Sequence, residues 1–130
     1  MIIGIGLDIQ SISKIAASIE SPSYHKKVFT PAEIALCQSA PHPADHFTGK
    51  FAVKEACMKA LGMGIRQGIW FTDIEVLNHA TGAPYLNLYN EAQRQAAAWH
   101  VTTTHVSLSH SAGIAVGVVI LETLHRHDSG

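Results

Sequence analysis

The run from Phe47 to Gly62 predicts one long helix, and it constrains the fold of this chain more than any other segment. It is rich in Ala, Lys, Leu and Met, lacks internal proline, and stops at the glycine pair Gly62 and Gly64, which suits a helix C-terminus. At about 100° per residue, Glu55 and Lys59 share one stripe between two apolar edges. The apolar pattern therefore predicts that Glu55 and Lys59, although charged, lie at buried positions.

Two interpretations of this charge are open. An i,i+4 surface ion pair between Glu55 and Lys59 would contribute about 0.3–0.5 kcal/mol. Alternatively, the carboxylate and the ammonium face a ligand cleft. Lys50 and Lys54 form a second stripe on the far side of the same helix. The helix alone does not decide between the two interpretations.

The composition predicts one compact domain with local recognition sites. The chain has 130 residues, 47% of them hydrophobic, a net charge of −1 and 15% charged residues. This balance argues against a bulk nucleic-acid or membrane binder, and the longest apolar runs fall well short of the roughly 20 residues of a membrane span. Cys37 and Cys57, without a CxxC pair or a signal peptide, indicate reduced thiols and a cytoplasmic protein. The nine histidines lack zinc-ligand spacing.

Expected strands and helices are segregated along the chain rather than strictly alternating. The start FTPAEIALCQ is a clear helix N-terminus, with Thr30 as N-cap, Pro31 as first helical residue and Glu33 as capping-box partner. Besides the two helices already described, we expect a buried strand at 1–9, helices at 11–20 and 91–99, and strands at 72–78, 84–89, 105–109 and 113–121. The pattern predicts an α+β domain over 1–124 with a mainly antiparallel sheet, and a frayed tail at 125–130.

The first strand carries a face of bare backbone. Alternation places Gly4, Gly6 and Asp8 on one side, where the glycines admit the close approach of a helix or ligand. Asp8 at the strand end is either a hard-metal ligand or the cap of the following helix. A dinucleotide-binding fingerprint is only weakly indicated, because Ile9 stands where the third glycine belongs.

The segment THVSLSHSAG carries a further candidate site. His105, Ser107 and Ser109 share one strand face, and His110 is expected where the strand gives way to a turn. His110 is either an ordinary surface residue or, together with Ser109, a donor to a phosphate or pantetheine oxygen.

Five segments together resemble the holo-(acyl-carrier-protein) synthases, the small single-domain 4′-phosphopantetheinyl transferases. They are GIGLDI, FTPAEIALC, GKFAVKEACMKALGMGI, DIEVLNHATGAPYL and HVSLSHSAGIAVGVVILE, and the resemblance runs over residues 2–122. A strand-end Asp followed by F-x-x-K-E-A-x-x-K is its most specific element. The resemblance implies the 4′-phosphopantetheinyl transferase fold, with the sheet packed on one long helix. It also implies Mg²⁺-dependent transfer of phosphopantetheine from coenzyme A to a serine of apo acyl carrier protein, releasing adenosine 3′,5′-bisphosphate.

The resemblance also implies roles for individual residues. Asp8 and Glu55 match the ligands of a magnesium ion that also holds the coenzyme A diphosphate, and Lys59 matches the lysine at the phosphates. Glu55 is the candidate base, directly or through a metal-bound water, and His110 completes the implied catalytic set. Contacts to coenzyme A are implied for Lys50, Lys59, Gly64, Gly82, Pro84, Ser109 and His110, with the segment Gly82 to Pro84 beside the adenine.

Family members assemble as trimers with the coenzyme site between neighbouring subunits, so the resemblance implies a homotrimer. Lys14 matches the carrier-docking position, where arginine is frequent, and Lys50 also stands where arginine is usual. Both positions keep the positive charge but lose the bidentate hydrogen bonding of a guanidinium group. The default client is the carrier of fatty-acid synthesis, with polyketide or multidomain synthase carriers as alternatives. No nucleic-acid or membrane partner is expected. A non-catalytic coenzyme binder and a metal-dependent hydrolase are the competing functions.

Overall fold

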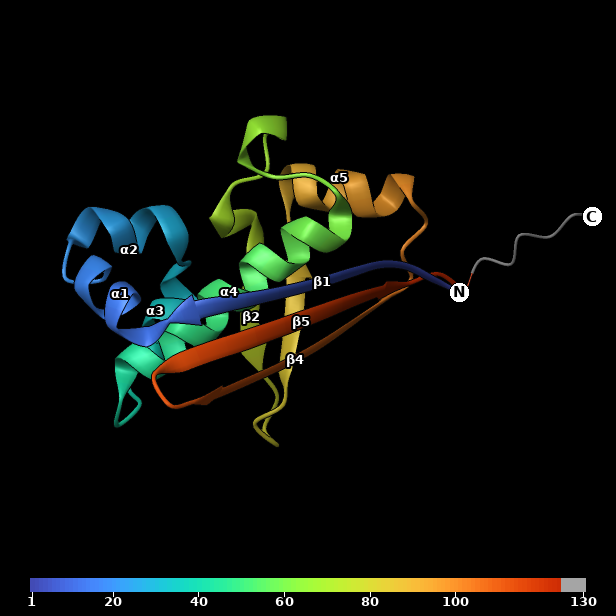
Figure 1. Cartoon of the computed structure of the whole chain (residues 1–130). Coiled ribbons are helices and arrows are strands. Elements are labelled where there is room, and N and C mark those ends of the chain that lie inside the picture. The colour runs from blue at the N-terminus through green and yellow to red at the C-terminus, as the bar shows by residue number, and fades with distance from the viewer. Residues whose placement is uncertain (125–130) are drawn as a thin grey trace, which may run out of the picture.

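The structure, a computed structural model, describes residues 1–124. The expected tail at 125–130 lies outside the described residues. The elements in chain order are β1 (Ile2–Ser11), α1 (Ile12–Ser18), α2 (Pro22–Val28), α3 (Pro31–Gln38), α4 (Pro43–Leu61), the 3₁₀ turns η1 (Ile65–Gln67) and η2 (Phe71–Asp73), β2 (Ile74–Asn78), β3 (Pro84–Leu88), α5 (Asn90–Ala98), β4 (Thr103–Ser111) and β5 (Ile114–Glu122) (Figure 1). Within this part of the chain, no helix is both long and apolar enough to cross a membrane.

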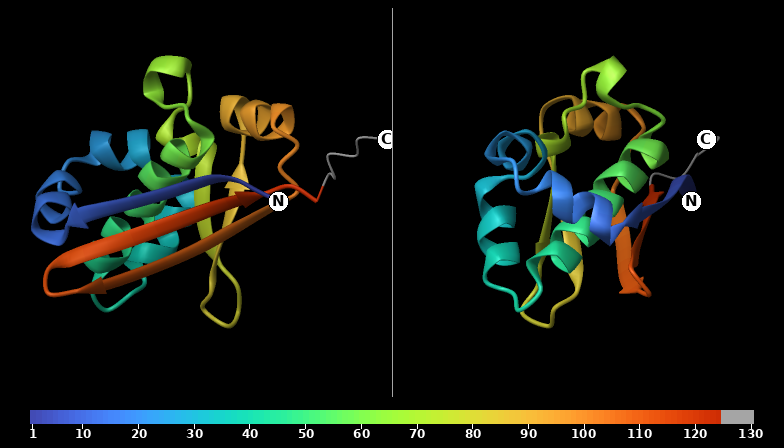
Figure 2. Two further views of the ribbon diagram at one scale, coloured as in Figure 1. Left: turned by 45° about the vertical axis from the view of Figure 1, so that its right-hand side comes forward. Right: turned by 60° about the vertical axis from the view of Figure 1, so that its left-hand side comes forward.

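The long helix α4 forms the centre of the domain. On one side it packs on a three-stranded antiparallel sheet of order β1-β5-β4, and on the other it contacts α3 and the antiparallel β2–β3 hairpin. Figure 2 shows the same arrangement from two further directions. The expected α+β architecture with antiparallel pairing and one long helix is therefore confirmed.

Glycines allow α4 to lie directly on the sheet. A Cβ atom at Gly6 would lie 1.7 Å from the carbonyl oxygen of Ala56, and one at Gly4 would lie 2.3 Å from that of Ala60. Real Cβ atoms do not approach backbone so closely, so a larger residue at either position would push the helix away. The expectation that the bare face of β1 admits a helix is confirmed. This contact fixes the height of α4 relative to Asp8, which lies on the same strand face.

The expectation that β1 is a buried strand is wrong for its other face. Ile5, Leu7 and Ile9 are 62%, 54% and 59% exposed. Because side chains alternate along a strand, these three point away from α4 onto the outer face of the sheet, where Leu7 pairs with Val118 of β5. The apolar run is therefore half core and half exposed surface within the described residues.

Local signals explain the α3 helix well and the neighbouring segments less well. The capping box is confirmed: the Thr30 hydroxyl accepts from the Glu33 N–H at 3.3 Å, and Glu33 Oε1 accepts from the Thr30 N–H at 2.8 Å. The structure adds a helix, α2, that the sequence pattern does not predict, because its seven residues carry no apolar repeat beyond Tyr24 and Val28. Cys37 and Cys57 lie buried as free thiols.

Candidate active site

The structure brings Asp8, Glu55 and Lys59 together where β1 crosses α4. Lys59 Nζ lies 3.0 Å from Asp8 Oδ1 and donates to the carbonyl oxygen of Leu7 at 2.9 Å. The other carboxylate oxygen of Asp8 accepts from Gln10 Nε2 at 2.7 Å, and only 11% of the Asp8 side chain is exposed. This geometry orients Asp8 toward the helix and leaves the Lys59 ammonium at the surface of the site.

The alternative role of Asp8 as a helix cap is wrong. Ser11 is the N-cap of α1, and its hydroxyl accepts from the Lys14 N–H at 3.3 Å. Asp8 is three residues too early to reach the first turn of that helix. Its carboxylate is therefore available for the site between β1 and α4.

Glu55 lies next to this pair, half-buried on α4. Burial raises the pKa of the Glu55 carboxyl above its usual value, the negative charge of Asp8 raises it further, and Lys59 partly opposes both effects. The ion pairs of residues 1–124 join Lys59 to Asp8 and not to Glu55. The surface ion pair expected as one interpretation is therefore wrong. The charge of Asp8 instead acts on Glu55 as a neighbouring like charge.

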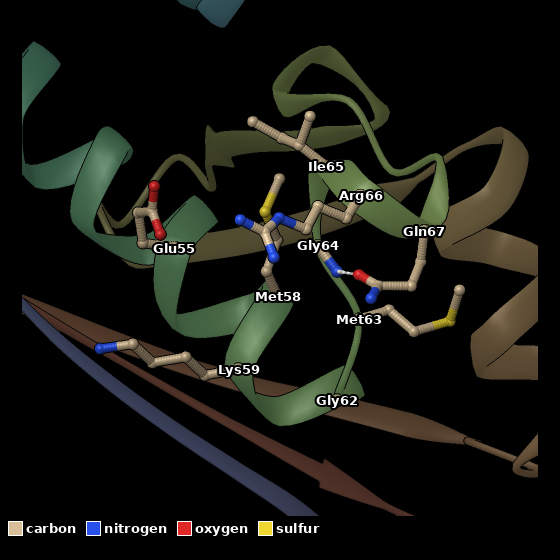
Figure 3. A pocket seen from close by; sticks show the side chains of 9 residues that line it. All are labelled: Glu55, Met58, Lys59, Gly62, Met63, Gly64, Ile65, Arg66 and Gln67. Atoms are coloured by element: carbon tan, nitrogen blue, oxygen red, sulfur yellow. Dashed lines mark hydrogen bonds between the residues drawn. The ribbon is translucent and has the colours of Figure 1, made fainter.

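A cavity of about 400 Å³ opens beside Glu55 and Lys59. Its floor is the last turn of α4 and its wall is the loop from Gly62 to Gln67, including Gly64 (Figure 3). Gly62 ends α4 in the left-handed conformation, with φ of 67°, which turns the chain back over the helix end. The predicted helix stop thus also builds the cavity wall.

The other expected coenzyme contacts form a second cluster. Lys50, Gly82, Pro84 and His110 line a cavity of about 190 Å³ that shares no lining residue with the first. Lys50 is buried there, and its Nζ donates to the Val76 carbonyl oxygen at 2.7 Å and to Asn78 Oδ1 at 3.0 Å. Within one chain, the predicted site residues that line a cavity therefore divide between two separate cavities.

His110 and Ser109 lie next to each other near the end of strand β4. His110 is the penultimate residue of β4, just before the turn at Ala112 and Gly113, so the expected place at the strand end is confirmed. Neighbouring strand residues point to opposite faces: His110 reaches the second cavity, with Nδ1 4.0 Å from Asp45 Oδ2, whereas Ser109 is exposed on the outer face. The two side chains of one chain therefore lie on opposite faces of β4, and a joint contact with coenzyme A stays a prediction.

Lys14 is exposed on α1, and Lys26 and Lys27 are exposed on α2. Their side chains face solvent, as expected of residues that would meet a partner surface. Neither cavity described above includes them.

The sequence did not predict the partner of Lys54. Its Nζ lies 2.7 Å from Glu33 Oε1, and both side chains are fully buried. Glu33 Oε2 in turn accepts from the Val76 N–H at 2.7 Å, so the pair ties α3, α4 and β2 together one residue before Glu55. The sequence signal that could have indicated this burial is the position of Lys54 on a helix stripe bordered by the apolar residues Cys57 and Leu61.

Comparison with known proteins identifies the family of this chain. The family model of the 4′-phosphopantetheinyl transferase superfamily matches residues 4–119. This chain belongs to that superfamily. The holo-[acyl-carrier-protein] synthase of Syntrophus aciditrophicus (strain SB) is 46% identical over 126 residues, covering 95% of this chain and 98% of the relative. That of Geobacter sp. (strain M21) is 40% identical over 124 residues, covering 94% and 99%.

Solved structures of this transferase superfamily share the fold. The Helicobacter pylori holo-[acyl-carrier-protein] synthase in complex with coenzyme A has a TM-score of 0.78 at 32% identity, covering 91% of this chain and 99% of that chain. The Neisseria meningitidis holo-[acyl-carrier-protein] synthase has a TM-score of 0.84 at 28% identity, covering 95% and 100%. The expected 4′-phosphopantetheinyl transferase fold is confirmed, and the chain is an enzyme of the holo-[acyl-carrier-protein] synthase type.

Proposed function

We propose that this transferase moves the 4′-phosphopantetheine group of coenzyme A to a serine of an apo acyl carrier protein, releasing adenosine 3′,5′-bisphosphate. The observation that carries the proposal is the meeting of Asp8, Glu55 and Lys59 beside the α4 cavity. Synthases of this family from Helicobacter pylori and Bacillus anthracis have been crystallised with coenzyme A. Those complexes support coenzyme A as the donor substrate.

The reaction is a substitution at the β-phosphorus of coenzyme A. The serine Oγ forms the new P–O bond, and the bond from that phosphorus to the bridging oxygen breaks, so this oxygen leaves on the α-phosphate. Lys59, exposed at the cavity edge, offsets the negative charge that builds on the leaving phosphate. Glu55 takes the proton of the serine hydroxyl. Its raised pKa brings the carboxylate nearer to the working pH, which favours a general base. Transfer should therefore fail as the pH falls through this raised pKa and Glu55 is protonated.

Asp8 and Glu55 are the residues that would hold Mg²⁺. Two neighbouring carboxylates provide the hard oxygen ligands that this ion prefers, and the repulsion that raises the pKa of Glu55 would be relieved by a cation. Residues 1–124 contain no group of three or more His, Cys, Asp or Glu side chains placed to enclose a metal. The donor set therefore suits an ion that shares its coordination with a phosphate ligand and water. When bound, the ion supplies charge neutralisation at the diphosphate oxygens.

We further propose that a homotrimer completes the coenzyme site. The cavity with Lys50, Pro84 and His110 is separate from the one with Glu55, as two halves of a site between subunits would be. The exposed apolar side chains on the outer face of β1, including Leu7, supply a surface for such an assembly. In this arrangement the adenine end of coenzyme A would contact one subunit and the diphosphate would contact its neighbour.

Product analysis of Glu55→Gln tests the proposal. The wild-type enzyme, given coenzyme A, magnesium and apo carrier, should release adenosine 3′,5′-bisphosphate only when the carrier is present. The variant should fold normally and lose roughly 10²–10⁴-fold in rate. Glu91→Gln on α5, where the glutamate pairs with Arg94, is the matched control and should retain activity. Release without a carrier would indicate a hydrolase, and near-wild-type turnover of Glu55→Gln would contradict the role of Glu55.

A further inference from the structure

Arg66 is a charged residue of the α4 cavity that none of the roles above uses. It lies in η1 on the loop that walls the cavity, and its guanidinium extends from the loop back toward the helix that carries Glu55 and Lys59 (Figure 3). In the described part of the chain, it forms no ion pair with a carboxylate. Lys59, the other cation of the cavity, lies 3.0 Å from Asp8 and is 54% exposed, so its ammonium can still reach a ligand in the cavity.

The backbone that carries Arg66 is held firmly in place. Gly64 donates its N–H to Gln67 Oε1 at 2.7 Å, and the Gly64 carbonyl oxygen accepts from Gln67 at 3.0 Å and from Ile69 at 3.2 Å. Ile69 is fully buried and anchors the end of the loop in the core. The loop therefore fixes where Arg66 begins, while its side chain stays exposed and has no hydrogen-bond or ion-pair partner among residues 1–124.

We propose that Arg66 is a catalytic residue that binds the diphosphate of coenzyme A from the loop side of the cavity, with Lys59 binding it from the helix. This inference rests on the proposed function. A planar guanidinium offers two parallel N–H donors to phosphate oxygens, which a lysine ammonium does not. Two cations from two different elements hold the transferred phosphoryl group between them and offset its charge as the bridging oxygen leaves.

Kinetics of Arg66→Ala and Arg66→Lys test this assignment. The alanine variant should lose about 10- to 100-fold in kcat/KM for coenzyme A, as expected for a charge-assisted hydrogen bond. Its KM for the carrier should stay within about twofold of wild type. Arg66→Lys should recover part of the loss, since it keeps the charge without the fork. Arg94→Ala, which removes an exposed arginine paired with Glu91 on α5, is the matched control and should behave as wild type.

One further measurement locates the contact on the ligand. The loss in Arg66→Ala should persist with dephospho-coenzyme A, which keeps the diphosphate and lacks the 3′-phosphate. If the loss disappears with that substrate, Arg66 binds the 3′-phosphate and the proposal is wrong. A rise in KM for the carrier alone would place Arg66 on the docking surface and would also overturn it.

Calorimetric titration with coenzyme A and magnesium separates this inference from the proposed function. If the wild-type enzyme binds coenzyme A but transfers nothing, the proposed function fails, while weaker binding by Arg66→Ala would still support the contact. If wild-type and Arg66→Ala bind coenzyme A equally and turn over equally, the contact does not exist.

Discussion

Replacing Lys54 by methionine should destabilise the fold by about 3–5 kcal/mol, because the change leaves Glu33 buried without its counter-ion. The two side chains are fully buried, and Lys54 Nζ lies 2.7 Å from Glu33 Oε1. Methionine nearly preserves the length and volume of lysine, so the variant removes the charge and the donors without opening a large cavity.

The magnitude follows from what the substitution leaves without a partner. Lys54 Nζ also donates to the carbonyl oxygens of Phe71, at 2.9 Å, and Ile74, and both carbonyls lose this donor in the variant. Glu33 keeps the N–H groups of Thr30 and Val76, which compensate only part of its charge. Burial lowers the pKa of Lys54 and Glu33 opposes that shift, so desolvation and ion pairing act on the same atoms. The loss should therefore lie in the range for breaking a buried pair rather than that for a surface pair.

Thermal unfolding followed by circular dichroism measures the effect. For a domain of 130 residues, the unfolding entropy is about 0.27 kcal/mol/K, so the melting temperature should fall by roughly 11–18 °C. Lys27→Met, at an exposed lysine of α2, is the matched control and should shift it by about 2 °C or less. The double variant with Glu33→Gln and Lys54→Met should recover part of the lost stability, because the unpaired carboxylate charge is removed as well. A melting temperature of Lys54→Met within about 2 °C of wild type would refute the reasoning.

Three further changes test the packing, the docking surface and the assembly. Gly6→Ala should lower the free energy of unfolding by at least about 3 kcal/mol, since its Cβ would lie 1.7 Å from a backbone oxygen of α4. The control Gly64→Ala, with no neighbour closer than 3.8 Å, should melt near wild type. Equal melting temperatures of the two variants would contradict the close approach. Lys14→Glu should raise the KM for the carrier several-fold, about 1–2 kcal/mol, in a salt-dependent way, and leave the KM for coenzyme A nearly unchanged. Equal small effects on the two KM values would make Lys14 an ordinary surface residue. Light scattering should give a trimer, and Leu7→Asp, on the exposed face of β1, should dissociate it; a wild-type monomer at micromolar concentration would rule out the assembly.

Local sequence signals predicted the parts of the fold that depend on neighbouring residues. The period of two along β1 placed Gly4, Gly6 and Asp8 on one face, and the structure puts that face against α4. The Thr30 capping box located the start of α3. These patterns are short-range, so the sequence carries them without knowledge of the tertiary fold.

Features that depend on distant segments could not be predicted in the same way. Lys59 is joined to Asp8 across 51 positions of sequence and Lys54 to Glu33 across 21, and the spacing within α4 favours neither partner. Period-two alternation distinguishes the two faces of a strand but does not indicate which face packs on the core. The apolar run therefore predicts a buried Ile5, although this residue is exposed. Tertiary packing decides both questions.

Intact mass spectrometry of an apo acyl carrier protein tests the central claim most directly. The carrier is incubated with coenzyme A, magnesium and the enzyme, with the Glu55→Gln variant in parallel. The account predicts a mass gain of one phosphopantetheine group on the carrier serine with the wild-type enzyme and little or none with the variant. An unmodified carrier in the wild-type reaction, with coenzyme A either intact or cleaved, would contradict it.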